Sequence, residues 1–140
     1  MTARVFLDTN VLLDHLLGRE PHAEDAGEVW AMVERGEIVG CVAAISFNFV
    51  YYVVRHQAGE RAARRALSGM RDLFEIVAVD AQSIHQAIDS DFSDVEDAIQ
   101  HAAAVRAGAA PIITRDTTGF RRSSLPVMSP KAFLKSLPRG

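Results

Sequence analysis

Two aspartates follow apolar segments near opposite ends of the chain. Asp8 comes directly after the apolar run 5–7, and Asp116 comes just after the run 111–114. In parallel α/β sheets, ligands bind outside the carboxyl ends of the strands. Carboxylates at two such ends would offer the oxygen ligands that a hard divalent cation prefers. This pattern predicts metal-assisted hydrolysis of a phosphodiester bond.

A third acid comes from the acidic segment 91–97, which precedes an alanine-rich stretch. Its four carboxylates repel one another unless a cation, solvent or a helix N-terminus stabilises them, and the helix end accounts for only part of the cluster. Asp97 begins the pattern 97–104, whose small residues allow close packing against a sheet. The Asp97 side chain is therefore predicted to point toward the strand ends.

Strand and helix signals alternate along the chain, which indicates a parallel sheet covered by helices on both faces. The expected strands are 4–7, 37–43, 74–79 and 110–114, with a short edge strand at 125–128. The expected helices are 11–17, 21–35, 46–54, 60–73, 81–88, a long helix ending near 108, and 130–137. Because no linker or repeat interrupts this order, residues 1–140 are predicted to form one domain.

The composition is typical of a compact globular protein, with 49% hydrophobic residues and a formal net charge of −3. A negative charge argues against a general nucleic-acid coat protein, but it leaves a nuclease open because metal-binding carboxylates count as negative. Cys41 is the only cysteine, which excludes a disulfide framework and a cysteine metal cluster. The sequence shows no membrane span or signal peptide, so a cytoplasmic location is expected.

Local charge is more informative than the total. Arg115, Arg121 and Arg122 flank Asp116 and are candidates for contact with a phosphate backbone. Asp14 lies within an apolar stretch and is expected to face solvent, close enough to approach the acidic site. The apolar content of the expected helices 46–54 and 60–73 indicates a homodimer.

Four short motifs together resemble those of a PIN domain. They are LDTNVLL at 7–13, EDAIQ at 96–100, ITRD at 113–116 with Phe120, and PVMSP at 126–130. The resemblance covers nearly the whole chain and rests on the order and spacing of the motifs. It implies a three-layer α/β/α sandwich around a parallel sheet of four to five strands. It also implies a ribonuclease that depends on Mg²⁺ or Mn²⁺, and many bacterial members resemble VapC toxins, which a small antitoxin holds inactive.

The resemblance assigns roles to individual residues. Three positions match the catalytic and metal-binding acids of the family: Asp8, Asp97 and Asp116. Asn10 would shape the turn after the first strand and hydrogen-bond a site acid, and Thr114 would orient the carboxylate of Asp116. Two acids near Asp97 in the sequence, Asp94 and Glu96, would be auxiliary. The RNA substrate would contact the three arginines that flank Asp116.

One position departs from the family pattern. PIN domains usually carry a glutamate three residues after the Ser or Thr that opens the third helix, and here Ser46 is followed by Phe49 at that position. Asn48 would supply a neutral amide oxygen if the helix were shifted by one residue. The missing acid leaves a second function open, a PIN-like module that binds nucleic acid or protein without cleaving it. A phosphatase with Asp8 as nucleophile is disfavoured, because Asn10 stands where such an enzyme has a second aspartate.

Overall fold

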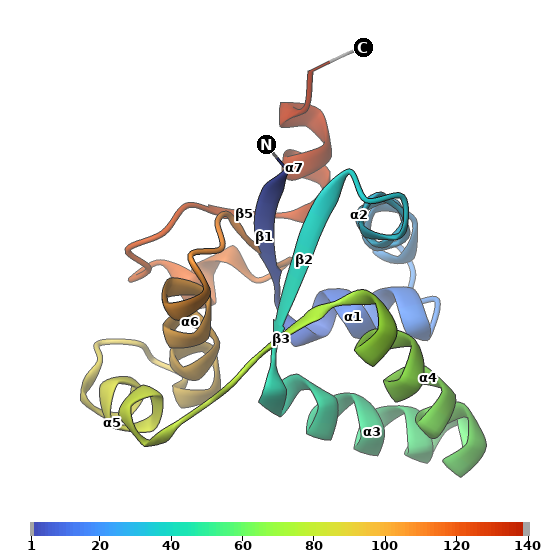
Figure 1. Ribbon diagram of the computed structural model, residues 1–140, viewed down its shortest axis with the longest axis horizontal. Helices are drawn as coiled ribbons and strands as arrows, with labels where there is room; N and C mark the ends of the chain where they lie inside the picture. The colour runs from blue at the N-terminus through green and yellow to red at the C-terminus, as the bar shows by residue number, and fades with distance from the viewer. Residues whose placement is uncertain (1, 139–140) are drawn as a thin grey trace.

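The computed structural model describes residues 2–138, and within them the strands form one parallel sheet (Figure 1). The sheet has five strands in the order β3-β2-β1-β4-β5. Their bounds are β1 Ala3–Leu7, β2 Ile38–Ala43, β3 Glu75–Val77, β4 Ile112–Ile113 and β5 Val127–Met128. Every neighbouring pair is parallel, which confirms the predicted α/β class and strand number.

Helices connect the strands and cover both faces of the sheet. They are α1 Thr9–Leu16, α2 Ala23–Glu34, α3 Ala44–Ala58, α4 Glu60–Leu73, α5 Ala81–Asp89, α6 Val95–Ala107 and α7 Pro130–Ser136, with a short 3₁₀ helix, η1, at Thr117–Phe120. In Figure 1, α1 to α4 lie on one side of the strands, and α5 and α6 lie on the other. This is the predicted three-layer α/β/α arrangement. The turn η1 was not predicted, and α3 extends past its expected end to the residue before Gly59.

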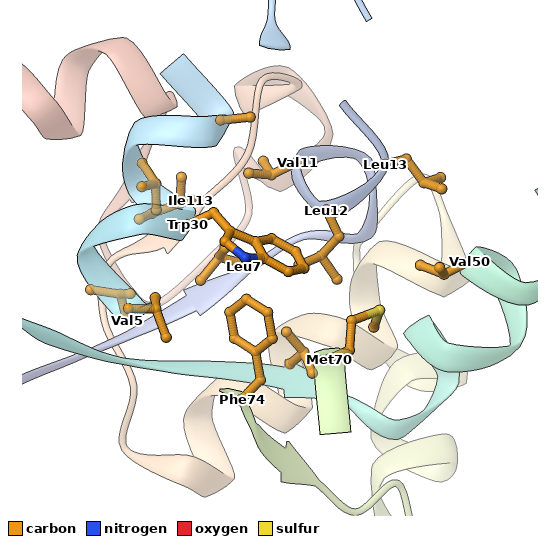
Figure 2. Close-up of a cluster of buried hydrophobic side chains, with 14 of the residues drawn as sticks. Val5, Leu7, Val11, Leu12, Leu13, Trp30, Val50, Met70, Phe74 and Ile113 are labelled. Carbon is orange, nitrogen blue, oxygen red and sulfur yellow. The ribbon is translucent and has the colours of Figure 1, made fainter. Parts of the chain in front are cut away.

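Side chains of β1 alternate between two hydrophobic clusters, because successive residues of a strand point to opposite faces. Val5 and Leu7 pack with α1 and α2 in the larger cluster (Figure 2). Phe6 packs on the opposite face with Ala103 and Ala104 of α6. The small alanine side chains let α6 approach the sheet closely, and this places the start of α6 near the carboxyl end of β1.

The larger cluster contains a close aromatic contact. Trp30 and Phe74 meet edge to face with their ring centres 4.9 Å apart (Figure 2). A Cβ atom at Gly40 would lie 2.7 Å from the Phe74 ring. The ring can therefore lie flat against β2 only because position 40 carries no side chain.

The carboxyl ends of β1 and β4 lie side by side. Leu7 is paired with Ile113, and the Asp8 N–H donates to the Ile113 carbonyl at 3.0 Å. The residues that follow both strands therefore meet at one edge of the sheet. Within residues 2–138, no helix has the length and apolar character needed to cross a bilayer.

Candidate active site

Asp8 lies at the centre of a buried hydrogen-bond network, with only 4% of its surface exposed. Gln100 Nε2 donates to its Oδ1 at 2.8 Å, and Thr114 Oγ1 donates to its Oδ2 at 2.7 Å. Burial raises the pKa of the Asp8 carboxyl, and these hydrogen bonds oppose the rise. The network therefore fixes the direction of a carboxylate that has been taken out of water.

Thr114 links Asp8 to Asp116 through the backbone. Its Oγ1 donates to the Asp8 carboxylate and accepts the Asp116 N–H at 3.1 Å. Thr114 was predicted to orient the carboxylate of Asp116, and its observed hydrogen bonds correct this prediction. A hydroxyl has a single proton to donate, and here Asp8 receives it. Thr114 instead fixes the backbone of residue 116 relative to Asp8.

Gln100 is a site residue to which the sequence analysis assigned no role. It is fully buried on α6, and its Oε1 accepts the Thr9 N–H at 3.3 Å while its Nε2 donates to Asp8. It comes three residues after Asp97 and so shares a helix face with it. A buried amide requires partners for both ends. One polar side chain on an alanine-rich inner face was the signal that would have identified it.

The carboxylates of Asp97 and Asp116 both reach Gly119 of η1. A Cβ atom at Gly119 would lie 2.7 Å from Asp97 Oδ2 and 2.9 Å from Asp116 Oδ2. The Gly119 N–H also donates to Asp116 Oδ1 at 3.2 Å, which holds η1 against the acid. Because glycine has no Cβ atom, η1 can lie this close to both carboxylates.

The two predicted auxiliary acids differ in position. Asp94 Oδ1 accepts the Asp97 N–H at 3.1 Å, so Asp94 caps the first turn of α6. Glu96 lines the same cleft as Asp8 and Asp97. Burial raises the pKa of Glu96, and the charges of Asp8 and Asp94 add to the rise. Glu96 therefore belongs to the acidic surface, whereas Asp94 shapes the helix that carries it.

Negative charge accumulates at this edge of the sheet without a cationic side chain to offset it. No lysine or arginine in residues 2–138 forms an ion pair with Asp8, Asp97 or Asp116. Burial raises the pKa of Asp97 to about 7, and four neighbouring carboxylates contribute to the rise: Asp8, Asp94, Asp116 and Glu96. A bound cation would relieve this repulsion.

The donor set fits a hard, hydrated divalent cation. Besides the carboxylates, it contains Asn10 Oδ1, which is buried and has no hydrogen-bond partner in the described chain. Within residues 2–138, no three acidic, histidine or cysteine side chains are grouped closely enough to enclose an ion. Mg²⁺ keeps several of its waters and takes only one or two carboxylates from a protein. Asp97 and Asp116, whose oxygens converge beside Gly119, would supply these carboxylates.

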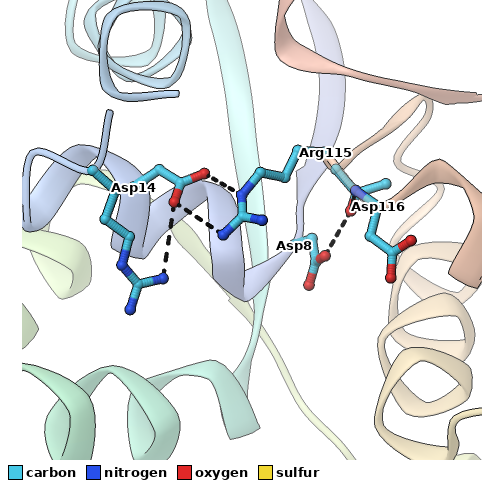
Figure 3. Close-up of polar contacts among 6 residues, drawn as sticks. Asp8, Asp14, Arg115 and Asp116 are labelled. Atoms are coloured by element: carbon cyan, nitrogen blue, oxygen red, sulfur yellow. Dashed lines mark hydrogen bonds and ion pairs between the residues drawn. The ribbon is translucent and has the colours of Figure 1, made fainter. Parts of the chain in front are cut away.

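Asp14 is buried, which corrects the expectation that it faces solvent. It is 1% exposed. Arg115 Nε donates to its Oδ2 at 2.7 Å and Arg115 Nη2 to its Oδ1 at 3.3 Å, and Arg19 Nη1 lies 3.8 Å from Oδ1 (Figure 3). A buried carboxylate is tolerated when it is paired in this way. The local pattern around Asp14 cannot reveal the pairing, because Arg115 is distant in the sequence.

The three arginines predicted to contact a phosphate backbone have different surroundings. Arg115 already binds the Asp14 carboxylate. Arg121 and Arg122 are exposed directly after η1, and Arg122 borders a hollow of about 370 Å³ together with His101. Backbone contact by Arg121 and Arg122 stays a prediction, whereas Arg115 is engaged in an ion pair within the protein.

Phe49 stands on the wall of the cleft that contains the acids. This cleft of about 180 Å³ is lined by Asp8, Thr9, Asn10, Leu13, Phe49, Val53, Glu96 and Asp97. Phe49 is 39% exposed, and Asn48 is not among the lining residues. One turn earlier on α3, Ser46 Oγ hydrogen-bonds with Thr9 Oγ1 at 2.7 Å. The position at which an acid was expected therefore does border the site, and it presents an aromatic ring.

Known proteins share this architecture. The family model described as "PIN domain" matches residues 4–118. A toxin–antitoxin complex from Klebsiella pneumoniae has a TM-score of 0.67 at 24% identity, covering 90% of this chain and 97% of that one. VapBC from Salmonella typhimurium, solved bound to DNA, has a TM-score of 0.66 at 15% identity, covering 91% and 98%. VapC20 from Mycobacterium tuberculosis, described as a toxin that cleaves the sarcin–ricin loop, has a TM-score of 0.63 at 18% identity, covering 77% and 86%.

A comparison with curated proteins found no match. The solved structures are similar to this chain in fold, at low sequence identity. The family model covers most of the chain and includes Asp8, Asp97 and Asp116. This chain therefore belongs to the PIN-domain family.

Proposed function

We propose that this chain is an endoribonuclease that requires Mg²⁺ or Mn²⁺ and uses Asp8, Asp97 and Asp116 as catalytic and metal-binding residues. The observation that carries the proposal is the acid cluster around the buried Asp8, in which Asp8, Asp97 and Asp116 have no lysine or arginine partner within residues 2–138. Membership of the PIN-domain family supports nuclease chemistry. VapC20, which is similar in fold, is described as a toxin that cleaves the sarcin–ricin loop.

Each acid has a role that follows from its contacts. A bound divalent cation would lower the pKa of a water molecule and offset the charge on the phosphate oxygens. Asp97 and Asp116 would hold the ion, because their oxygens converge beside Gly119. Asp8 would keep a fixed direction, because Gln100 and Thr114 hold both of its oxygens. The protein would thus supply two carboxylates to the ion and a third, fixed carboxylate beside them.

The RNA backbone would approach the site from the side of η1. Arg121 and Arg122 are exposed there, and the acids at the adjacent cleft bring no cation of their own. Arginine side chains bind phosphate through charge-assisted hydrogen bonds. These two residues would therefore bind the RNA backbone on the η1 side of the bond to be cut.

We also propose that the protein is the toxin of a toxin–antitoxin pair and forms a homodimer. Two structures of similar fold are a toxin–antitoxin complex and a DNA-bound VapBC. Apolar side chains on α3 and α4 are only partly buried, among them Tyr51, Ala66 and Leu67, which supports contact between two copies. Growth arrest on expression that the product of a neighbouring gene relieves would support the toxin role. Only monomer in analytical ultracentrifugation at micromolar concentration would contradict the homodimer.

The test is cleavage of a mixed-sequence single-stranded RNA by purified protein, shown to be folded and free of other proteins. The reaction is run with Mn²⁺, Mg²⁺ or EDTA. Cleavage should require the metal and should vanish in Asp116→Asn, which keeps the shape of the side chain and removes its charge. Asp89→Asn is the matched control, because Asp89 is exposed at the end of α5. Undiminished cleavage by Asp116→Asn would rule out the assigned site.

Phe49 favours a second candidate function, a module that binds nucleic acid or protein without cleaving it. A ring at the cleft wall adds no metal ligand, so the affinity for the ion would be lower than with a glutamate there. RNA binding without metal-dependent cleavage would support this function. Cleavage that depends on both metal and Asp116 would exclude it.

A further inference from the structure

We infer that Phe49 is a stacking surface for one RNA base beside the phosphate on which the acids act. The inference deepens the proposed function and rests on it, because it takes the acidic cleft as the place where the phosphate binds. Phe49 lines the same cleft as Asp8 and Asp97, and 39% of its surface is exposed. An aromatic ring that lines a polar cleft offers a flat face on which a base can stack.

The cleft is lined by two chemically different kinds of side chain. Asp8, Glu96 and Asp97 are carboxylates, whereas Leu13, Phe49 and Val53 are apolar. A nucleotide has the same division, because its phosphate is charged and its base has two flat π faces. The volume of about 180 Å³ is smaller than the roughly 300–1,000 Å³ of a site for a drug-sized ligand. The cleft therefore fits one base and not a folded ligand.

Stacking also gives a role to Phe49 at a position where PIN domains usually carry a glutamate. A glutamate at position 49 would add charge to a cleft that already holds three carboxylates. Phe49 adds none, and its face stacks on any base because every base has a π face. Position 49 would thus contribute affinity for single-stranded RNA with little preference for sequence.

Tyr52 provides a matched control on the same helix. It is more exposed than Phe49, at 59%, but it borders a separate hollow with Arg55 and His56. If an exposed aromatic ring on α3 were sufficient, both residues would contribute equally to RNA binding. If the acidic cleft is required, Phe49 contributes far more.

The experiment measures binding of fluorescently labelled single-stranded RNA by anisotropy, with Asp116→Asn in every protein to prevent cleavage. Phe49→Ala should weaken binding about tenfold, in line with the loss of one base stack. Phe49→Trp should restore binding. Phe49→Leu, which keeps the apolar volume without a ring, should not restore it. Tyr52→Ala should change binding less than twofold.

A second set of RNAs carries a single abasic ribose at each position in turn. One position should weaken binding to the parent protein about tenfold, and the same change should have no further effect in Phe49→Ala. This non-additivity is the signature of a direct pair. An abasic penalty that persists unchanged in Phe49→Ala would overturn stacking. Stacking would also be overturned if Phe49→Leu bound RNA as well as the parent protein, or if no protein in the series bound RNA.

The same measurements separate this inference from the proposed function. If RNA binding depends on Phe49 but the wild-type protein does not cleave RNA, the stacking inference is supported and the nuclease proposal is rejected. Metal-dependent cleavage that Phe49→Ala leaves unchanged at every RNA concentration would keep the nuclease and reject stacking. A dimer that dissociates in Phe49→Ala, with RNA binding unchanged, would assign Phe49 to a contact between copies and also reject stacking.

Discussion

Asp8 and Asp14 are both buried, one just before α1 and the other within it, yet their surroundings are opposite in charge. Asp14 is paired with the guanidinium groups of Arg115 and Arg19 (Figure 3). Asp8 accepts hydrogen bonds only from neutral donors, and further carboxylates surround it. The protein thus neutralises one buried carboxylate permanently and leaves the other in an excess of negative charge.

The contrast shows what distinguishes a structural acid from a site acid. Arg115 is next to Asp116 in the sequence, but its guanidinium binds Asp14 instead of the acid cluster. A permanently attached cation at the cluster would compete with a metal ion for the same oxygens. By engaging Arg115, Asp14 therefore keeps that arginine away from the site acids. Under the proposed function, this leaves the acids available for an ion that binds reversibly.

The largest expected effect is the loss of the Asp14 ion pair. Asp14→Ala removes a carboxylate that accepts two hydrogen bonds from Arg115, and charge-assisted hydrogen bonds contribute about 1.5–3 kcal/mol. The free energy of unfolding, measured in urea, should fall by about 2–3 kcal/mol. Asp72→Ala is the control, because Asp72 is exposed and its pair with Arg71 contributes little. Equal stability of Asp14→Ala and wild type would show that the Asp14 ion pair does not stabilise the fold.

The next effect is stabilisation by metal. If the acid cluster binds Mn²⁺, an ion concentration ten times Kd should stabilise the wild-type protein by about 1.4 kcal/mol. Differential scanning fluorimetry should show a higher Tm with Mn²⁺ that EDTA reverses. Asp116→Asn should lose the increase. An equal increase in that variant would place the bound ion elsewhere.

A smaller effect concerns pH in the absence of metal. The pKa of Asp97 is raised to about 7 in the folded protein, whereas it is near 4 in an unfolded chain. The folded state therefore holds this proton more tightly, and its contribution to stability is lost as the pH rises from about 4 to about 7. Asp97→Asn in EDTA should raise Tm by a few degrees at pH 8 and leave it unchanged at pH 4.

Asp89→Asn is the control for this titration, because Asp89 is an exposed aspartate outside the cluster. Its Tm should follow that of wild type at both pH values. An Asp97→Asn protein that is less stable than wild type at pH 8 would mean that repulsion at the cluster is already relieved without metal.

The smallest expected effect is the loss of stability when Arg19, the more distant of the two arginines that pair with Asp14, is removed. Arg19 lies 3.8 Å from Asp14 Oδ1, farther than the 2.7 Å of the Arg115 contact. Arg19→Ala should therefore lower the free energy of unfolding by less than about 1 kcal/mol, and Arg115→Ala should lower it by more. Urea unfolding of both variants gives the comparison. The reverse order would make Arg19 the main partner of Asp14.

The acids at the strand ends could be predicted because their cause is local. An apolar run followed by an aspartate indicates a buried strand and the end of that strand, and parallel strands align such ends. Asp8 and Asp116 were expected at one edge for this reason, and the pairing of Leu7 with Ile113 places the residues that follow both strands side by side. The layered fold follows from the same local patterns.

The contacts that govern charge at the site could not be predicted in the same way. The partner of Asp14 lies on a segment near the other end of the chain, and no local periodicity encodes a pair of that separation. The close approach of Gly119 to two carboxylates depends on how η1 folds back on Asp97, which only the tertiary structure specifies. Gln100 could be recognised in the sequence as a polar residue on an apolar helix face, but its hydrogen bond to Asp8 could not.

A substitution at Gly119 would inactivate the proposed site by adding a methyl group, without changing any charge. In Gly119→Ala, one methyl group would displace the Asp97 and Asp116 oxygens from their places, and every acid of the cluster would remain. Such a protein would be inert in cleavage assays and yet unchanged in charge toward RNA or an inhibitory protein. It could be produced in cells that the active form would harm. It would then serve as bait for the natural substrate, which the active form destroys.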